Sequence, residues 1–98
     1  MDPELKAQWV KALRSGEYRQ GRELLKSSAG AFCCLGVLCD IQGAVFDNPL
    51  LFSMGMQTSH VPPVYSGGLG LNDQTYLAEK NDNGQSFIEI ADYIEANH

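Results

Sequence analysis

The sequence predicts an α+β protein that is rich in helix, with about four helices around one core and a small irregular β-hairpin region in the middle. Three observations favour this class. Apolar residues recur at helical spacing towards both ends, residues 31–42 are almost entirely apolar, and prolines and glycines gather between residues 44 and 71. A chain of 98 residues suits one domain, so residues 1–98 are expected to form a single small globular unit.

The first helix is predicted to begin at Pro3 and to end at Ser15–Gly16. Asp2 can accept hydrogen bonds from the amides of the first turn, and the negative charge of Glu4 is favourable there. The connector that follows is polar and is expected to lie on the surface. A further helical turn is predicted over residues 22–26.

The central apolar run, residues 31–42, is expected to lie in the middle of the core. Periodicity alone does not separate a buried strand from a buried helix in such a run. The spacing of Leu35, Leu38 and Ile41 favours a helix that follows an extended entry at residues 31–32 and ends at Gln42.

The middle of the chain is expected to hold short strands. Phe52, Met54 and Met56 alternate with polar residues, which predicts a half-buried strand that forms a hairpin with residues 45–46 or 64–65. Pro62–Pro63 is predicted to make a rigid extended corner. An apolar strand at a sheet edge is also a pairing surface, so the chain is expected to form a homodimer.

Two helices are predicted after residue 71. Asn72 or Asp73 can cap the first, and residues 81–84 end it. Ser86 and Glu89 have the capping-box spacing, which predicts that the last helix starts at Ser86. The expected core consists of the apolar stripes of all these helices: Leu5, Trp9, Leu13, Phe32, Leu35, Leu38, Ile41, Leu77, Phe87, Ile90 and Ile94.

Charge is distributed unevenly along the chain. The net charge is −5, yet residues 1–26 hold six of the seven basic residues and sum to +2, whereas residues 27–98 sum to −7. An acidic protein is a poor non-specific DNA binder, although a local basic face could hold a small phosphorylated ligand. No apolar window is long enough for a membrane span, and the N-terminus lacks the plan of a secretion signal, so a soluble intracellular protein is expected.

The cysteines and histidines give no catalytic or metal-binding pattern. Cys33, Cys34 and Cys39 lie inside the most apolar run and lack the paired spacing of a zinc site, so core packing is the expected role, with a reactive thiol as the alternative. His60 and His98 do not form a recognisable pair with them. We therefore expect no catalytic residue, metal or cofactor.

The segment RSGEYRQGR is the candidate ligand-binding site. It places three guanidinium groups, a phenol and a carboxamide close together, which are groups that stack on a base or bind phosphate. The alternative is a solvated connector. If the partner is a protein, Glu89, Asp92 and Glu95 of the last helix are the alternative steering surface. The candidate ligand-binding residues are Arg14, Tyr18, Arg19, Gln20 and Arg22.

The blocks WVKALRSGEYRQGRELL, FCCLGVLCD and SFIEIADYIE together resemble a family of small, largely uncharacterised proteins of tailed bacteriophages. The resemblance covers roughly half of the chain, and the FCCLGVL block is its most distinctive part. It implies a phage accessory protein that acts in the host cytoplasm, and it supplies no catalytic residues.

Three classes of function follow from these observations. The favoured one is a phage-encoded non-enzymatic binding protein that antagonises a bacterial defence system, either by sequestering a nucleotide-derived signal or by occluding a host protein. The alternatives are a small regulatory or virion-related protein-interaction module and a Cys-dependent enzyme. The expected partners are thus a small nucleotide-like anion or a host defence protein.

Overall fold

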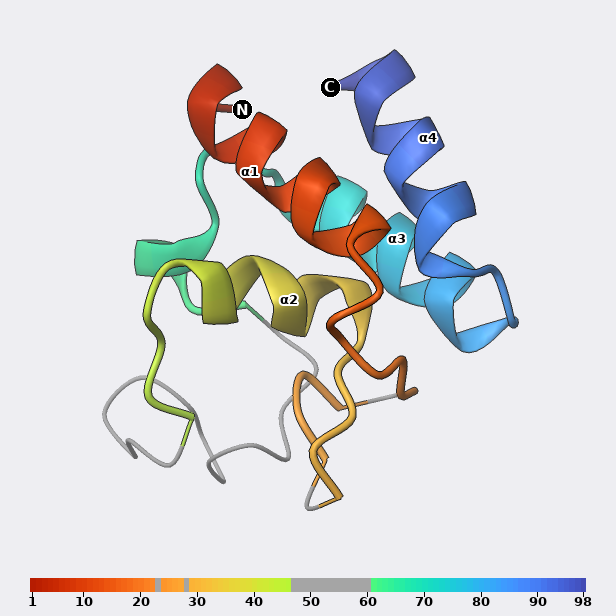
Figure 1. The fold of residues 1–98 in the computed structure, drawn as a ribbon. Coiled ribbons are helices and arrows are strands. Elements are labelled where there is room, and N and C mark those ends of the chain that lie inside the picture. Colours follow the sequence, from red (N-terminus) through yellow and green to blue (C-terminus); the bar gives the residue numbers. More distant parts are fainter. Residues whose placement is uncertain (23, 28, 47–60) are drawn as a thin grey trace.

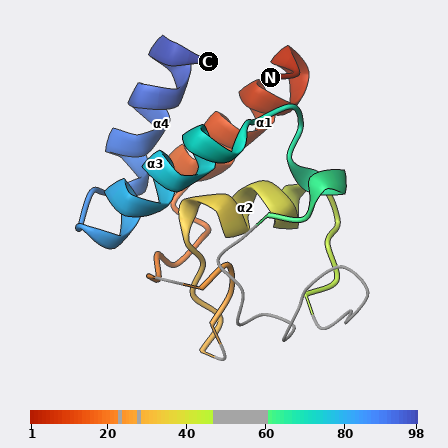
Figure 2. The ribbon, with the colours of Figure 1, turned by 180° about the vertical axis from the view of Figure 1, so that it is seen from behind.

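The computed structural model describes residues 1–22, 24–27, 29–46 and 61–98. In this part the chain forms helices around one core (Figures 1 and 2). The elements are α1 (Pro3–Arg14), α2 (Cys34–Ile41), the 3-10 helix η2 (Pro63–Tyr65), α3 (Leu71–Asp82) and α4 (Phe87–Asn97). Helix α1 packs against α4 and α2, and α3 packs against α2 and α4. Among the described helices, none has the length and apolar character to cross a membrane.

The predicted α+β class is wrong for this part of the chain, which is helical. The described residues contain only isolated bridges, which join Phe32 to Gln20 and Lys26, and no strand or sheet. Residues 64–65, a proposed hairpin partner, belong to η2 instead, because Pro63 favours the first position of a helical turn and lacks a ladder donor. Residues 45–46 are not a strand either, and Phe52–Met56 lies outside the described residues.

Side-chain caps start α1 and α4 where the sequence predicts them. The Asp2 carboxylate accepts the Leu5 amide at 3.1 Å, with Pro3 as the first helical residue. Ser86 and Glu89 form the complete capping box. Each cap satisfies amides that the first turn cannot pair internally, so both starts are confirmed.

The predicted boundaries of the other helices are less accurate. Cys33 caps α2, its sulfur accepting the Gly36 amide at 3.4 Å, and α2 ends at Ile41, one residue before the predicted end. Gly70, rather than Asn72 or Asp73, precedes α3, and it makes no side-chain cap bond.

The predicted helical turn over residues 22–26 is wrong. Leu25 is completely buried, and its carbonyl accepts the Cys33 amide at 3.3 Å. Ser27 likewise donates its amide to the Ala31 carbonyl at 2.8 Å. Pairing with the segment before α2 therefore satisfies backbone groups that a helical turn would have used.

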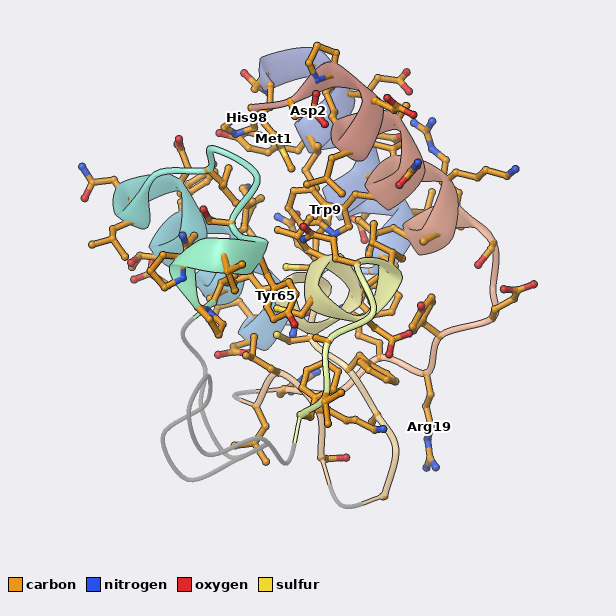
Figure 3. The ribbon with its side chains drawn as sticks, turned by 90° about the vertical axis from the view of Figure 1, so that its left-hand side faces the viewer. Met1, Asp2, Trp9, Arg19, Tyr65 and His98 are labelled. Carbon is orange, nitrogen blue, oxygen red and sulfur yellow. The ribbon has the colours of Figure 1, made fainter. Side chains whose placement is uncertain are left out.

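The predicted core is largely confirmed. Trp9 is completely buried between the helices, and its indole Nε1 donates to the Cys34 carbonyl at 2.9 Å (Figure 3). Only Leu5 and Ile41 of the predicted set lie at the edge, where they are partly buried. The core also contains Cys33, Cys34, Val37 and Cys39 of the central apolar run, as expected, and Ala91 on the apolar stripe of α4. The buried apolar residues that the sequence did not predict are Val10, Leu25, Phe46, Val61 and Leu69.

Candidate functional site

Arg14, the first residue of the predicted ligand-binding segment, is paired within the chain. Its Nη2 lies 2.6 Å from an Asp92 carboxylate oxygen, and its Nη1 lies 2.9 Å from Glu95 Oε2. The hydrogen bond to Asp92, followed by that to Glu95, raises the pKa of Arg14. The guanidinium thus joins the end of α1 to α4.

Tyr18 is packed rather than presented for stacking. Its hydroxyl donates to Asp40 Oδ2 at 2.6 Å, and its ring meets the Phe32 ring edge-on with centroids 5.1 Å apart. Burial, together with the hydrogen bond to the Asp40 carboxylate, raises the pKa of Tyr18 to about 12. This phenol is neutral at physiological pH and links the connector to α2.

The exposed Gln20 contributes to a polar cluster around the buried Asn81. Its Nε2 donates to Asn81 Oδ1 at 2.9 Å and to the Gln85 carbonyl at 2.6 Å. Asn81 is completely buried in α3, donates to the Gly21 carbonyl at 2.8 Å and accepts the Cys34 amide at 3.2 Å. These bonds hold the connector against α2 and α3, which is a structural use of the carboxamide.

Arg19 and Arg22 remain exposed, and the Arg19 side chain points away from the helices (Figure 3). The Arg22 guanidinium lies near the turn after α3, 3.6 Å from the point where a Cβ on Gly84 would lie. The five predicted residues therefore do not converge: one faces α4, two are used in packing, and two project separately.

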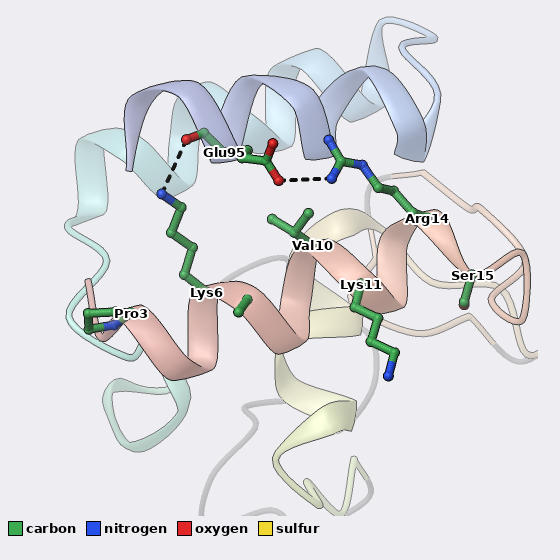
Figure 4. A pocket seen from close by; sticks show the side chains of 8 residues that line it. Pro3, Lys6, Val10, Lys11, Arg14, Ser15 and Glu95 are labelled. Atoms are coloured by element: carbon green, nitrogen blue, oxygen red, sulfur yellow. Dashed lines mark hydrogen bonds and ion pairs between the residues drawn. The ribbon is translucent and has the colours of Figure 1, made fainter.

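A groove of about 740 Å³ lies between α1 and α4 (Figure 4). All but one of its lining residues belong to α1 or its C-cap, and they recur every three or four residues, so they share one face of the helix. Val10 is nearly buried and forms the floor together with Ala7. The groove is lined by Pro3, Lys6, Ala7, Val10, Lys11, Arg14, Ser15 and Glu95.

The groove lining carries three basic side chains and one carboxylate, but Arg14 is paired with Asp92 as well as Glu95. The positive charge that no described carboxylate pairs therefore belongs to Lys6 and Lys11. Lys6 and Arg14 reach across to α4, where Lys6 Nζ donates to the Glu95 carbonyl at 3.2 Å (Figure 4). Lys11 points away from α4 and is exposed. Within the described residues it has no hydrogen-bond or ion-pair partner, so its charge is open to a ligand.

A second hollow, of about 280 Å³, lies on the adjacent face of α1 and is lined by Gln8, Lys11, Ala12, Ser15, Glu17, Tyr18 and Ile41. Lys11 and Ser15 line both hollows. Lys11 therefore lies between the two hollows.

Of the five predicted ligand-binding residues, only Arg14 lines the groove. Of the alternative acidic surface Glu89, Asp92 and Glu95, Glu95 lines it, and both Asp92 and Glu95 are paired with Arg14. The signal that could have found the groove is the stripe Pro3, Lys6, Ala7, Val10, Lys11 and Arg14, whose spacing of three and four residues marks one helix face.

The cysteines are packed in the core. Burial raises the pKa of Cys33 to about 11 and that of Cys39 to about 12, and it raises the pKa of Cys34 well above its usual value. Such thiols are protonated at neutral pH, whereas the thiolate is the nucleophile and metal ligand.

Among the described residues, no set of three or more potential ligands is gathered to bind a metal. His98 contacts only the edge of the Tyr93 ring among described aromatic rings, and His60 lies outside the described residues.

Comparison with known families gives one match. Residues 1–47 match the model of a domain of unknown function, DUF8296. This stretch includes α1 and α2, hence the α1 wall of the groove, but not Glu95. No significant match is found among curated proteins or among solved structures.

Proposed function

We propose that this chain is a non-enzymatic binding protein whose α1–α4 groove takes an acidic, partly apolar segment of a protein partner. The observation that carries this proposal is the placement of Lys6, Lys11 and Arg14 around an apolar floor, in the basic N-terminal part of an otherwise acidic chain. Charge complementarity of this kind selects and steers an acidic partner, and the apolar floor rewards side chains that cover it.

The shape and lining of the groove favour a protein segment over a nucleotide. The groove follows the twelve residues of α1, a length of roughly 18 Å at the rise of an α-helix. Its lining residues include no aromatic ring on which a base could stack. Tyr18, the stacking residue of the predicted site, is engaged with Asp40 and Phe32 instead. These features support occlusion of a protein rather than sequestration of a nucleotide-derived signal.

The resemblance to small tailed-phage proteins gives the proposal its biological setting. We propose that the partner is a host protein of a bacterial defence system, which the chain occludes in the host cytoplasm. The protonated, buried cysteines support a role that involves no thiol chemistry.

Calorimetric titration tests the proposal with defined probes. The acidic probe is a helical peptide with Glu at every third or fourth position and Leu or Ala between, and the control peptide carries Gln in place of Glu. We expect the acidic peptide to bind, with an affinity that falls as salt is added, and the control to bind much more weakly.

Two results would overturn the proposal. Binding of ADP-ribose or a cyclic nucleotide in the absence of peptide binding would favour sequestration of a small signal. Equal binding of the Glu and Gln peptides would mean that the basic groove does not select its partner by charge.

A further inference from the structure

We infer that Glu95 of α4 occupies, in the free chain, the anion position that the partner's carboxylate takes on binding, so that α4 carries a built-in competitor for the groove. This inference rests on the proposed function. It identifies Glu95 as a residue that sets both the affinity of the groove and its selectivity among ligands.

Glu95 holds two of the three basic side chains of the groove. Its carboxylate accepts a hydrogen bond from Arg14 Nη1 at 2.9 Å, and its backbone carbonyl accepts one from Lys6 Nζ at 3.2 Å (Figure 4). It is also the one α4 residue that lines the groove. An anion entering the groove therefore meets Glu95 at the position where Arg14 would bind it.

The ion pair between Glu95 and Arg14 is exposed enough for a partner carboxylate to replace that of Glu95. The two side chains are 60% and 37% exposed, so water and salt screen their attraction. A partner carboxylate would replace one charge-assisted hydrogen bond of Arg14 by another, while the Glu95 carboxylate moves into water. Asp92 accepts from the other guanidinium nitrogen, Nη2, at 2.6 Å and can keep Arg14 oriented during the exchange.

This exchange implies an order in which the basic side chains of the groove contact a ligand. Lys11, which has no partner within the described part of the chain, is open to the first contact. Arg14 becomes available only to a ligand whose negatively charged group replaces the Glu95 carboxylate as the hydrogen-bond acceptor of Arg14 Nη1. An apolar peptide would leave Glu95 in place, so Glu95 sharpens the selection of acidic ligands.

The test compares two substitutions that remove the same charge. Glu95→Gln removes the competitor, and Glu79→Gln makes the identical change on the exposed surface of α3, away from the groove. At low salt we expect Glu95→Gln to bind the acidic helical peptide on the order of two- to fivefold more tightly, as for loss of an exposed ion pair. Glu79→Gln is expected to change the affinity by less than that.

A second background isolates the contact. In a chain that already carries Arg14→Gln, the gain from Glu95→Gln should disappear, because the competition requires the guanidinium. Thermal unfolding followed by Trp9 fluorescence checks that each variant is folded, and both glutamates are exposed.

The outcomes separate this inference from the proposed function. If the wild-type chain binds the peptide but Glu95→Gln binds no more tightly, or no more tightly than Glu79→Gln, the inference is wrong and the groove function stands. A gain that persists in the Arg14→Gln background also overturns it. If neither the wild type nor Glu95→Gln binds the peptide, the proposed function itself is wrong.

Discussion

At the residue scale, Gly36 shows how closely the chain approaches itself beneath α2. A Cβ built on Gly36 would overlap the carbonyl oxygen of Leu25 and lie 2.6 Å from its carbonyl carbon. Both atoms belong to the backbone, which has little freedom to move away. The close contact explains why a glycine stands inside a helix, where it is otherwise unfavourable.

Gly36→Ala is therefore expected to lower the free energy of unfolding by about 3 kcal/mol, the upper range for overpacking, although helix propensity alone would raise it by about 1 kcal/mol. The control is Gly43→Ala. Gly43 has a φ of +81° with no atom within 4 Å of an added Cβ, so only backbone strain of about 1–2 kcal/mol is expected. Urea unfolding followed by Trp9 fluorescence measures both, and a more stable Gly36→Ala variant would contradict this packing.

Asn81 is the second residue on which local structure depends. Asn81→Leu removes the partners of the Cys34 amide and the Gly21 carbonyl, and each buried group left unsatisfied costs about 1–3 kcal/mol. Gln20→Ala removes only the outer bonds of the same cluster and should cost about 1 kcal/mol. Chemical denaturation of both variants compares the losses. Equal losses would mean that Asn81 does not anchor the cluster.

At the scale of elements, the sequence predicts helix starts where a side chain performs the capping. Asp2 and Ser86 are such residues, and both starts are confirmed. The start of α3 was misplaced because Gly70 offers no side-chain signal. The turn predicted over residues 22–26 failed because burial of Leu25 and pairing with the segment before α2 outweigh local propensity.

Ser86→Ala tests the capping box of α4. It removes the acceptor for the Glu89 amide and should lower the free energy of unfolding by about 1 kcal/mol. The matched control is Asn72→Ala. Asn72 was a predicted cap but lies inside α3, where alanine should change stability by no more than about 0.5 kcal/mol. If Asn72→Ala lowers the free energy of unfolding more than Ser86→Ala does, in thermal or urea unfolding, the assignment of Ser86 as the stabilising cap is wrong.

At the scale of the whole molecule, the sequence predicts the basic part of the chain that holds the groove but not the residues that line it, of which Arg14 alone belongs to the predicted ligand-binding set. The sequence shows a high density of basic residues before residue 27, but the face of α1 that lies beside α4 is set by packing between segments distant in sequence. Likewise, the partners of Gln20 are Asn81 and Gln85, at the other end of the chain. The homodimer through Phe52–Met56 stays a prediction, because that segment lies outside the described residues.

The raised pKa values of the Cys33 thiol and the Tyr18 phenol predict that the free energy of unfolding falls at alkaline pH. Folding raises the pKa of Cys33 from 9.0 to about 11 and that of Tyr18 from 10.0 to about 12. In the unfolded chain these groups lose their protons first, so the unfolded state binds fewer protons between those values. The free energy of unfolding should fall as pH rises from about 9 to about 12 and should be insensitive to these groups below about pH 8.

Urea unfolding at a series of pH values measures this dependence. Tyr18→Phe removes the tyrosine contribution and should make the decline shallower above about pH 10. An unchanged free energy of unfolding across the alkaline range would show that these groups ionise equally in the folded and unfolded chains.

The measurement that tests the central claim most directly is the affinity of two charge-reversal variants for the acidic helical peptide. Lys11→Glu places a negative charge on the open rim of the groove, and Arg19→Glu makes the same type of change in the exposed connector that the sequence singled out. We expect Lys11→Glu to weaken binding by about tenfold or more, the scale of a charge-assisted contact, and Arg19→Glu to leave it nearly unchanged. Loss of binding in Arg19→Glu with binding retained in Lys11→Glu would contradict the account and place the site in the connector.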